Sequence, residues 1–342
     1  MVLDKNGLRV DDTTPSVRFS VRNQAAINEG IAHLNKYGYT VFSDVMEMER
    51  IEENKELLWQ FLESIPAPYN RIRRNQPSTW NYWPGIRSHG VINTYGMGQS
   101  AFMWNIRSNR QIKRIYEQLW NRSDLLVSFE GCGIFRDWSF NETWKTEDGW
   151  NHVDQNPNSK PDRCCVQGFV SLTDQNESTG GLVVYPESHS RFSELRGLGK
   201  GSRDFVFVPA THPIFDGGRA IGKLVHCNAG DLVVWDSRTI HCNSPATVPK
   251  QNHGKVDLLR IVAYVSMSPI NLVSKQYTLD EFRFEREQMV QNNRTLTHWS
   301  TEIILGAMAN PLNKQQLSLD NFTTYQRTLI FGTIPEDKDD EK

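Results

Sequence analysis

The feature that most constrains the fold of this chain is a run of short β-type segments in its middle. From residue 125 onward, segments rich in branched and aromatic side chains alternate with turn residues, without long helical patterns between them. The predicted strands cover 125–129, 131–136, 163–172, 181–185, 205–208, 223–227, 231–235 and 258–267. A series of short strands of this kind is typical of a jelly roll or barrel. We therefore predict a mainly β fold with flanking helices around a jelly-roll core.

Helical patterns lie on both sides of this β region. Residues 23–36 and 46–63 carry apolar side chains at helical spacing, and Ser108 and Gln111 fit a capping box that opens a third helix. After the strands, Thr278 opens a further capping box. We predict one domain over residues 1–342, made of an N-terminal helical and loop region (1–124), the jelly-roll core (125–270) and C-terminal helices with an acidic tail (271–342).

The composition fits a soluble globular protein. Of the 342 residues, 38% are hydrophobic and 23% charged, and the formal net charge is −2. This balance gives no reason to expect nucleic-acid or membrane binding. The five cysteines form no C-x-x-C pair, so we expect reduced side chains and neither a disulfide framework nor a zinc site.

Targeting signals are not evident in the sequence. The first residues lack the apolar core of a signal peptide, and no apolar run approaches the length of a transmembrane helix. The chain does not end in the peroxisomal signal S-K-L. We therefore expect a cytoplasmic protein, and the sequence does not indicate its oligomeric state.

One short motif, His152-x-Asp154, suggests a metal centre. In a β-strand, residues two apart point to the same face, so this imidazole and carboxylate can bind one ion together. A second histidine from a later strand would complete a facial triad, as in non-heme Fe(II) oxygenases. We expect this ligand to be His241, which follows a predicted strand, with His226 as the rival. We expect His189 to have a structural role and His298 to have a surface or core role.

The motifs that follow His152-x-Asp154 appear in a characteristic order. They are L-x-D at 172–174, G-G-L-x-V-x-P-x-S-H at 180–189, G-D-L-x-x-x-D at 230–236, then a histidine and an arginine-bearing strand at 258–264. This ordered set resembles the phytanoyl-CoA dioxygenase family of Fe(II)- and 2-oxoglutarate-dependent oxygenases. The resemblance covers roughly residues 27–270.

The resemblance implies a function and a set of site residues. His152, Asp154 and His241 match the family's iron ligands, and no catalytic side chain is expected beyond them. Arg260 matches the arginine that binds the distal carboxylate of 2-oxoglutarate. The implied reaction uses O₂ to oxidise a C–H bond of a small or medium-sized organic substrate. It releases succinate and CO₂, and ascorbate is a supportive additive.

Two positions depart from the family pattern. Glu187 stands where a glycine is common. Asn243 stands two residues after the distal histidine, where many members have a serine close to 2-oxoglutarate, and its amide can donate a hydrogen bond instead. Independently of the family, Arg260 lies in a mostly apolar strand, where burial without an anionic partner is costly. A dicarboxylate would supply that partner.

Two other functions remain open from the sequence. One is a cupin-type metal enzyme that does not use 2-oxoglutarate. The presence of Arg260 argues against this function. The other is a non-catalytic jelly-roll binding protein. The presence of all three triad residues argues against this function. Fold class alone does not decide between them.

Residues 64–107 form a candidate substrate-binding segment. This segment is rich in Trp and Tyr, including Trp83, and carries Arg71, Arg73 and Arg74. One hypothesis is that it covers the substrate and that the arginines bind an anionic group. The alternative is a layer that only packs on the core.

Overall fold

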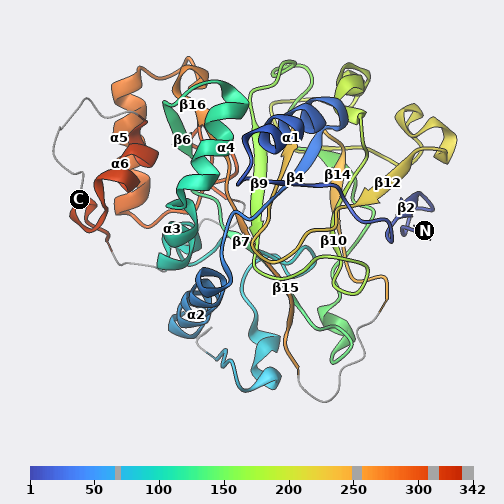
Figure 1. Ribbon diagram of the computed structural model, residues 1–342, viewed down its shortest axis with the longest axis horizontal. Helices are drawn as coiled ribbons and strands as arrows, with labels where there is room; N and C mark the ends of the chain where they lie inside the picture. The colour runs from blue at the N-terminus through green and yellow to red at the C-terminus, as the bar shows by residue number, and fades with distance from the viewer. Residues whose placement is uncertain (66–70, 249–255, 307–315, 333–342) are drawn as a thin grey trace.

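Two seven-stranded sheets form the centre of the computed structural model (Figure 1). The structure describes residues 1–65, 71–248, 256–306 and 316–332. In the first sheet the strand order is β1 (Val2–Leu3), β2 (Arg9–Asp11), β12 (Ile221–Leu224), β10 (Gly181–Val184), β14 (His241–Ser244), β8 (His152–Val153) and β11 (Val206–Phe207). In the second it is β3 (Arg18–Ser20), β4 (Tyr39–Ser43), β13 (Leu232–Asp236), β9 (Val166–Ser171), β15 (Leu258–Tyr264), β7 (Cys132–Arg136) and β5 (Val91–Ile92).

This arrangement confirms the predicted jelly roll. Strands that are distant in the sequence are neighbours in each sheet, and most pairs are antiparallel. A third, two-stranded sheet pairs β16 (Met267–Pro269) with β6 (Leu125–Val127), so the predicted strand 258–267 is in fact two strands. The predicted strands do not include β14, and β8 was expected only through the motif His152-x-Asp154.

The alternation of side chains along β13 shows where the core lies. Val233 and Trp235 face the interior between the two sheets, where they belong to the same cluster as Val184 of β10. Leu232 and Val234 face the other way, into the larger cluster beneath the helices. This period of two is what a strand buried on both faces requires.

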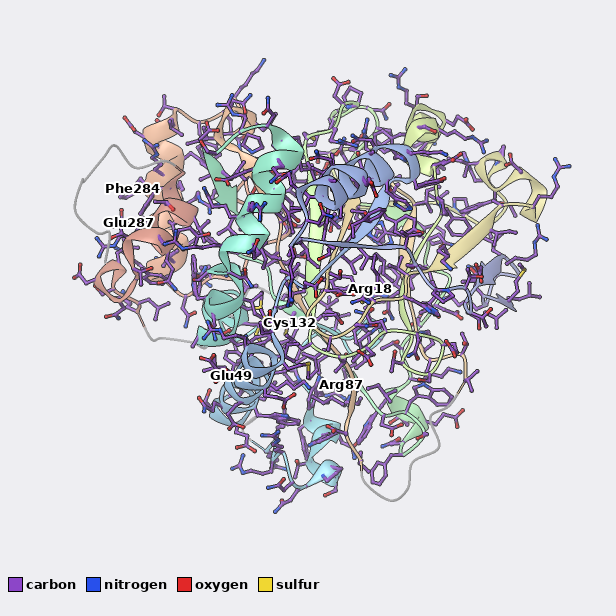
Figure 2. The ribbon with its side chains drawn as sticks, viewed as in Figure 1. Arg18, Glu49, Arg87, Cys132, Phe284 and Glu287 are labelled. Atoms are coloured by element: carbon purple, nitrogen blue, oxygen red, sulfur yellow. The ribbon has the colours of Figure 1, made fainter. Side chains whose placement is uncertain are left out.

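Helices cover the outer face of the second sheet and one end of the molecule (Figure 1). They are α1 (Gln24–Tyr37), α2 (Met48–Ser64), α3 (Ala101–Arg107), α4 (Arg110–Trp120), α5 (Leu279–Gln291) and α6 (Thr324–Phe331). Among the described residues, none of these helices is long and apolar enough to cross a membrane. Figure 2 shows Cys132 of β7 in the interior and Phe284 on the outward side of α5.

Of the two capping boxes predicted from the sequence, one is present in the structure and one is not. The capping box at Thr278 is present at the start of α5. The predicted box at Ser108 is wrong, because Asn109 is the N-cap of α4 and its side chain accepts from the Gln111 N–H. Ser108 instead ends α3. Adjacent polar residues compete for the same cap, and the preceding helix decides between them.

Arg286 connects the C-terminal helices to the rest of the protein. Its fully buried guanidinium donates to the carbonyl oxygens of Ile330 at 2.5 Å, Ser300 at 2.9 Å and Val127 at 2.7 Å. Burial lowers the pKa of Arg286 to about 9. We expect Arg286→Met to leave three buried carbonyls unpaired, at about 1–3 kcal/mol each, and to lower the thermal unfolding midpoint by about 5 °C or more.

The matched control for this prediction is Arg122→Met. Arg122 forms an exposed ion pair with Asp124 at 2.6 Å, a kind of interaction that contributes little to stability. Differential scanning calorimetry of both variants measures the effect. Equal unfolding midpoints for the two variants would contradict the role given to Arg286.

Candidate metal centre

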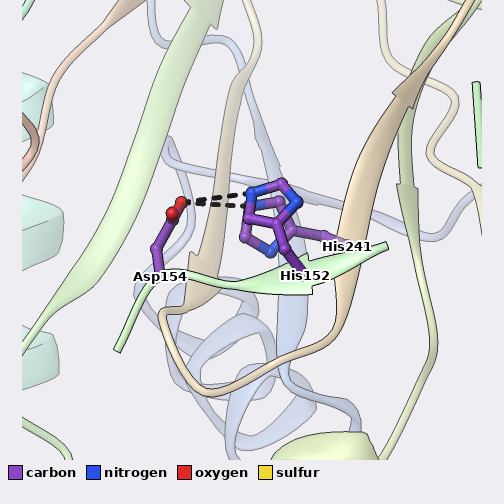
Figure 3. Close-up of side chains that lie close together, drawn as sticks. All are labelled: His152, Asp154 and His241. Carbon is purple, nitrogen blue, oxygen red and sulfur yellow. Dashed lines mark ion pairs between the residues drawn. The ribbon is translucent and has the colours of Figure 1, made fainter. Parts of the chain in front are cut away.

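Two histidines are brought together by strand pairing. His152 of β8 and His241 of β14 are direct cross-strand partners, so their side chains lie on the same face of the sheet. Their ring centroids are 4.3 Å apart. Asp154 follows β8, and its Oδ2 lies 3.6 Å from Nε2 of His152 and 3.3 Å from Nε2 of His241 (Figure 3). The three ligand atoms lie within 4.8 Å of one another, the only such group found in the described part of the chain.

The surrounding contacts fix the orientation of each ligand. Nδ1 of His152 lies 3.0 Å from the Trp150 carbonyl, and Nδ1 of His241 lies 2.9 Å from the Thr239 carbonyl. A carbonyl only accepts, so each Nδ1 carries the proton and each Nε2 offers a lone pair to the site. Gln167 donates to Oδ2 of Asp154 at 3.0 Å.

The His152 ring is also held between two aromatic rings. Trp150 stacks on it at 4.6 Å and 8°, and Phe205 stacks at 4.6 Å and 26°. Such contacts limit the rotation of the imidazole and keep Nε2 aimed at Asp154.

The electrostatics favour the ligand forms that bind a cation. Burial alone raises the pKa of the Asp154 carboxyl, but the two imidazoles, above all His152, hold it well below its ordinary value. Burial, and secondly the neighbouring His152, lowers the pKa of His241. An ionised carboxylate beside a neutral imidazole is the protonation state that divalent metals require.

The triad opens into a cavity of about 310 Å³. Its walls are largely apolar and include Phe169, Leu182, Trp235 and Val262 from the two facing sheets. The polar lining residues besides the triad include Arg260, Asn243, Gln175, Glu130 and His298.

Arg260 is a buried cation without an anionic partner. It is 2% exposed on β15, and its guanidinium lies 3.6 Å from the ring centroid of Phe135. It donates to Oδ1 of Asn243, its Nε has no hydrogen-bond partner, and no acidic side chain in the described residues pairs with it. Burial lowers the pKa of Arg260 to about 9. A charge buried in this way calls for an anion in the cavity.

The structure places Asn243 beside Arg260, and the hydrogen bonds of its amide differ from those expected. The sequence suggested that the amide replaces a serine as a donor to 2-oxoglutarate. In the structure its Nδ2 donates to Oγ1 of Thr146 at 3.1 Å, while its Oδ1 accepts from Arg260. Asn243 therefore positions the guanidinium.

The rival His226 and the expected structural His189 lie away from the triad. Nε2 of His226 lies 2.8 Å from the main-chain carbonyl of Asp12 and 3.9 Å from Glu177, and the residue does not line the cavity. His189 contacts the Asn35 carbonyl through Nε2 at 3.0 Å, as expected for a structural histidine.

Sequence reasoning missed three residues of the site: Gln167, Glu130 and His298. His298 was expected to have a surface or core role; it is buried, but it also lines the cavity, hydrogen-bonds to the main chain of Asp154 and leaves Nε2 unpartnered. Each stands alone outside the recognisable motifs. Only the tertiary fold brings them to the triad.

The segment 64–107 divides into two parts, and residues 66–70 lie outside the described residues. Ile86, His89, Val91 and Asn93 line the cavity. The tryptophans pack away from it.

The tryptophans and arginines of this segment form a separate layer. Trp83 is 3% exposed and packs against Trp59 and Trp80. Arg74 pairs with Glu56 at 2.7 Å, and Arg71 donates to the Tyr82 hydroxyl at 3.1 Å.

None of the three arginines suggested as an anion site lines the cavity, and one of them, Arg73, donates to the carbonyl of Ile72 at 2.7 Å. For the tryptophans and arginines, the packing layer is therefore the better description.

Known proteins resemble this chain in sequence and in fold. No family model matches it. Ava biosynthesis cluster protein O of Aspergillus versicolor is 27% identical over 284 residues, which are 79% of this chain and 86% of that protein. A putative phytanoyl-CoA dioxygenase of Dictyostelium discoideum is 24% identical over 252 residues, 60% of this chain and 67% of that protein.

The fold is shared with the non-heme alpha ketoglutarate dependent epimerase SnoN from nogalamycin biosynthesis. The TM-score is 0.50 at 16% identity, covering 72% of this chain and 85% of that one. The chain is thus similar in sequence to a protein that bears the name phytanoyl-CoA dioxygenase, and it shares its fold with SnoN. In this chain, the strands of the fold bring together the histidines and the carboxylate of the motif.

Proposed function

We propose that this protein is an Fe(II)- and 2-oxoglutarate-dependent dioxygenase. It oxidises a C–H bond of a small or medium-sized organic substrate and releases succinate and CO₂. The observation that carries the proposal is that one cavity contains both a two-histidine, one-carboxylate cluster and a buried arginine without an anion.

The residues present fit both groups. His152, Asp154 and His241 would hold the iron, since two imidazoles and one carboxylate leave coordination positions open for other ligands. Arg260, positioned by Asn243, would bind the distal carboxylate of 2-oxoglutarate through charge-assisted hydrogen bonds. When bound, iron and 2-oxoglutarate supply the oxidising chemistry by coupling O₂ reduction to decarboxylation.

The protein's own contribution is positioning and exclusion of water. Trp150 and Phe205 hold the His152 ring, and Gln167 holds the Asp154 carboxylate. The apolar walls of the cavity lower the local dielectric, which strengthens the charge interactions around the site.

A single domain over residues 1–342 remains part of this proposal, although the tail at 333–342 lies outside the described residues. We propose a reducing, cytoplasmic setting, which is supported by the five cysteines, all of them free. The suggestion of an anionic substrate rested on arginines that lie outside the cavity lining, so the proposal does not retain it.

The test is succinate formation in the absence of substrate. The purified protein is incubated with Fe(II), ascorbate, O₂ and 2-oxoglutarate, and succinate is measured by chromatography. We expect slow succinate formation that stops when either iron or O₂ is withheld. Iron binding without succinate would instead favour the cupin-type enzyme, and failure to bind iron would favour a non-catalytic jelly roll.

A further inference from the structure

Glu130 is an acidic residue of the cavity that the proposed reaction does not use. It lies two residues before the start of β7, whereas Phe135, on which Arg260 packs, lies near the other end of that strand. At about 3.3 Å per residue, the Cα atoms of residues 130 and 135 are separated by roughly 16 Å. Glu130 and Arg260 therefore belong to opposite ends of the cavity, which both residues line.

The carboxyl group of Glu130 has no counter-charge in contact with it. In the described residues, no side chain donates a hydrogen bond to it and no basic group pairs with it. The fully buried Arg107 donates to the main-chain carbonyls of Gly98 and Glu130, not to the carboxyl group. Burial, and secondly the charge of Asp154, raises the pKa of Glu130 to about 8, an effect that Arg107 only partly opposes.

Two other polar atoms of the cavity lining have no hydrogen-bond partner, and one of them belongs to Asn93, which lies against Gly131. Nε2 of His298 is buried without a hydrogen-bond partner, and so is Oδ1 of Asn93. Both residues line the cavity together with Glu130. The main chain holds this end in place, because Leu296 N–H donates to the Phe129 carbonyl at 2.9 Å.

Each end of the cavity thus lacks a charged partner, and the two missing partners have opposite charges. The Arg260 end requires an anion, which the proposed function supplies as 2-oxoglutarate. The Glu130 end requires a cation or a strong donor, because the acidic side chain has no basic partner among the described residues and Oδ1 of Asn93 has no hydrogen-bond partner. Leu296, which bonds to Phe129, adds an apolar wall at this end.

We propose that Glu130 is a specificity-determining residue that binds a protonated amine, and that the substrate is a compact, largely apolar amine. This inference rests on the proposed function, because it takes the cavity beside the triad as the substrate site. A protonated amine satisfies the carboxylate with charge-assisted hydrogen bonds, and the unpartnered Asn93 and His298 atoms are available to its remaining donors.

The test compares three probes that share one skeleton and differ in charge: 4-phenylbutylamine, 4-phenylbutanol and 4-phenylbutanoate. Binding is measured by isothermal titration calorimetry on the protein loaded with Fe(II) and 2-oxoglutarate under nitrogen. We expect the amine to bind about tenfold or more tightly than the alcohol, since hydrogen bonds between charged groups are the stronger ones. We expect the carboxylate to bind most weakly.

The variant Glu130→Gln keeps the shape of the side chain and removes its charge. We expect it to lower the affinity for the amine by about tenfold or more and to change the affinity for the alcohol little, which also shows that the cavity is intact. The matched control is Glu29→Gln, the same change on the exposed face of α1, which should leave the affinities for all three probes unchanged.

Several results would overturn the inference. They are equal binding of the three probes, no binding of the amine at millimolar concentration, or an unchanged affinity for the amine in Glu130→Gln. Succinate formation by the wild-type protein separates this failure from failure of the proposed function. If succinate forms and the amine shows no preference, only the inference about Glu130 is wrong.

Discussion

Replacing His241 with Ala is expected to abolish tight Fe(II) binding and all succinate formation. The substitution removes one of three ligand atoms that lie within 4.8 Å of one another. Loss of a residue that merely supports a ligand typically costs 10–100-fold in metal affinity, so loss of a ligand should weaken Fe(II) binding by more than about 100-fold. His152→Ala and Asp154→Ala should behave alike.

The matched control is His226→Ala, because His226 was the rival ligand and lies against Asp12 and Glu177. It should retain iron and activity. Anaerobic Fe(II) titration followed by metal analysis after desalting measures the effect directly. Retention of iron by His241→Ala together with its loss from His226→Ala would exchange the roles of the two residues.

Replacing Arg260 with Ala should raise the requirement for 2-oxoglutarate steeply while iron stays bound. Removing one partner of a buried, hydrogen-bonded ion pair costs about 3–5 kcal/mol, which corresponds to at least about 100-fold in the dissociation constant.

A cosubstrate that lacks the distal carboxylate sharpens this test. With the wild-type protein, 2-oxopentanoate should bind far more weakly than 2-oxoglutarate, and in Arg260→Ala the difference should largely disappear. Arg191→Ala, which removes an exposed arginine paired with Glu194, serves as the control. If Arg260→Ala still prefers 2-oxoglutarate to the same extent, the anion site lies elsewhere and the cupin-type alternative gains support.

Much of the fold was accessible from the sequence because the governing signals are local. The β13 segment alternates between two apolar faces, and such a strand has few places in a protein other than between two covered layers. The grouping of His152, Asp154 and His241 was also predictable, since motif order fixes which strands follow one another. That these residues bind iron remains a prediction.

The other end of the cavity could not be predicted for a physical reason. Glu130 and His298 stand in segments far apart in the chain, and they meet through single main-chain contacts such as Leu296 N–H to the Phe129 carbonyl. No periodicity or capping rule reports contacts of this kind. The tryptophans around Trp83 gave a clear sequence signal that fitted two structures. Aromatic richness is equally typical of a cavity wall and of a packed layer, and here the tryptophans form the packed layer.

The direct pairing of His152 with His241 also limits how the sequence can change over evolutionary time. One residue inserted into β8 or β14 would turn one imidazole to the opposite face of the sheet, so a single insertion there would disrupt the site. The connections between strands carry no such restriction. We therefore expect length differences among relatives of this protein to collect in the connections, while the lengths of these two short strands stay fixed even where most other residues differ.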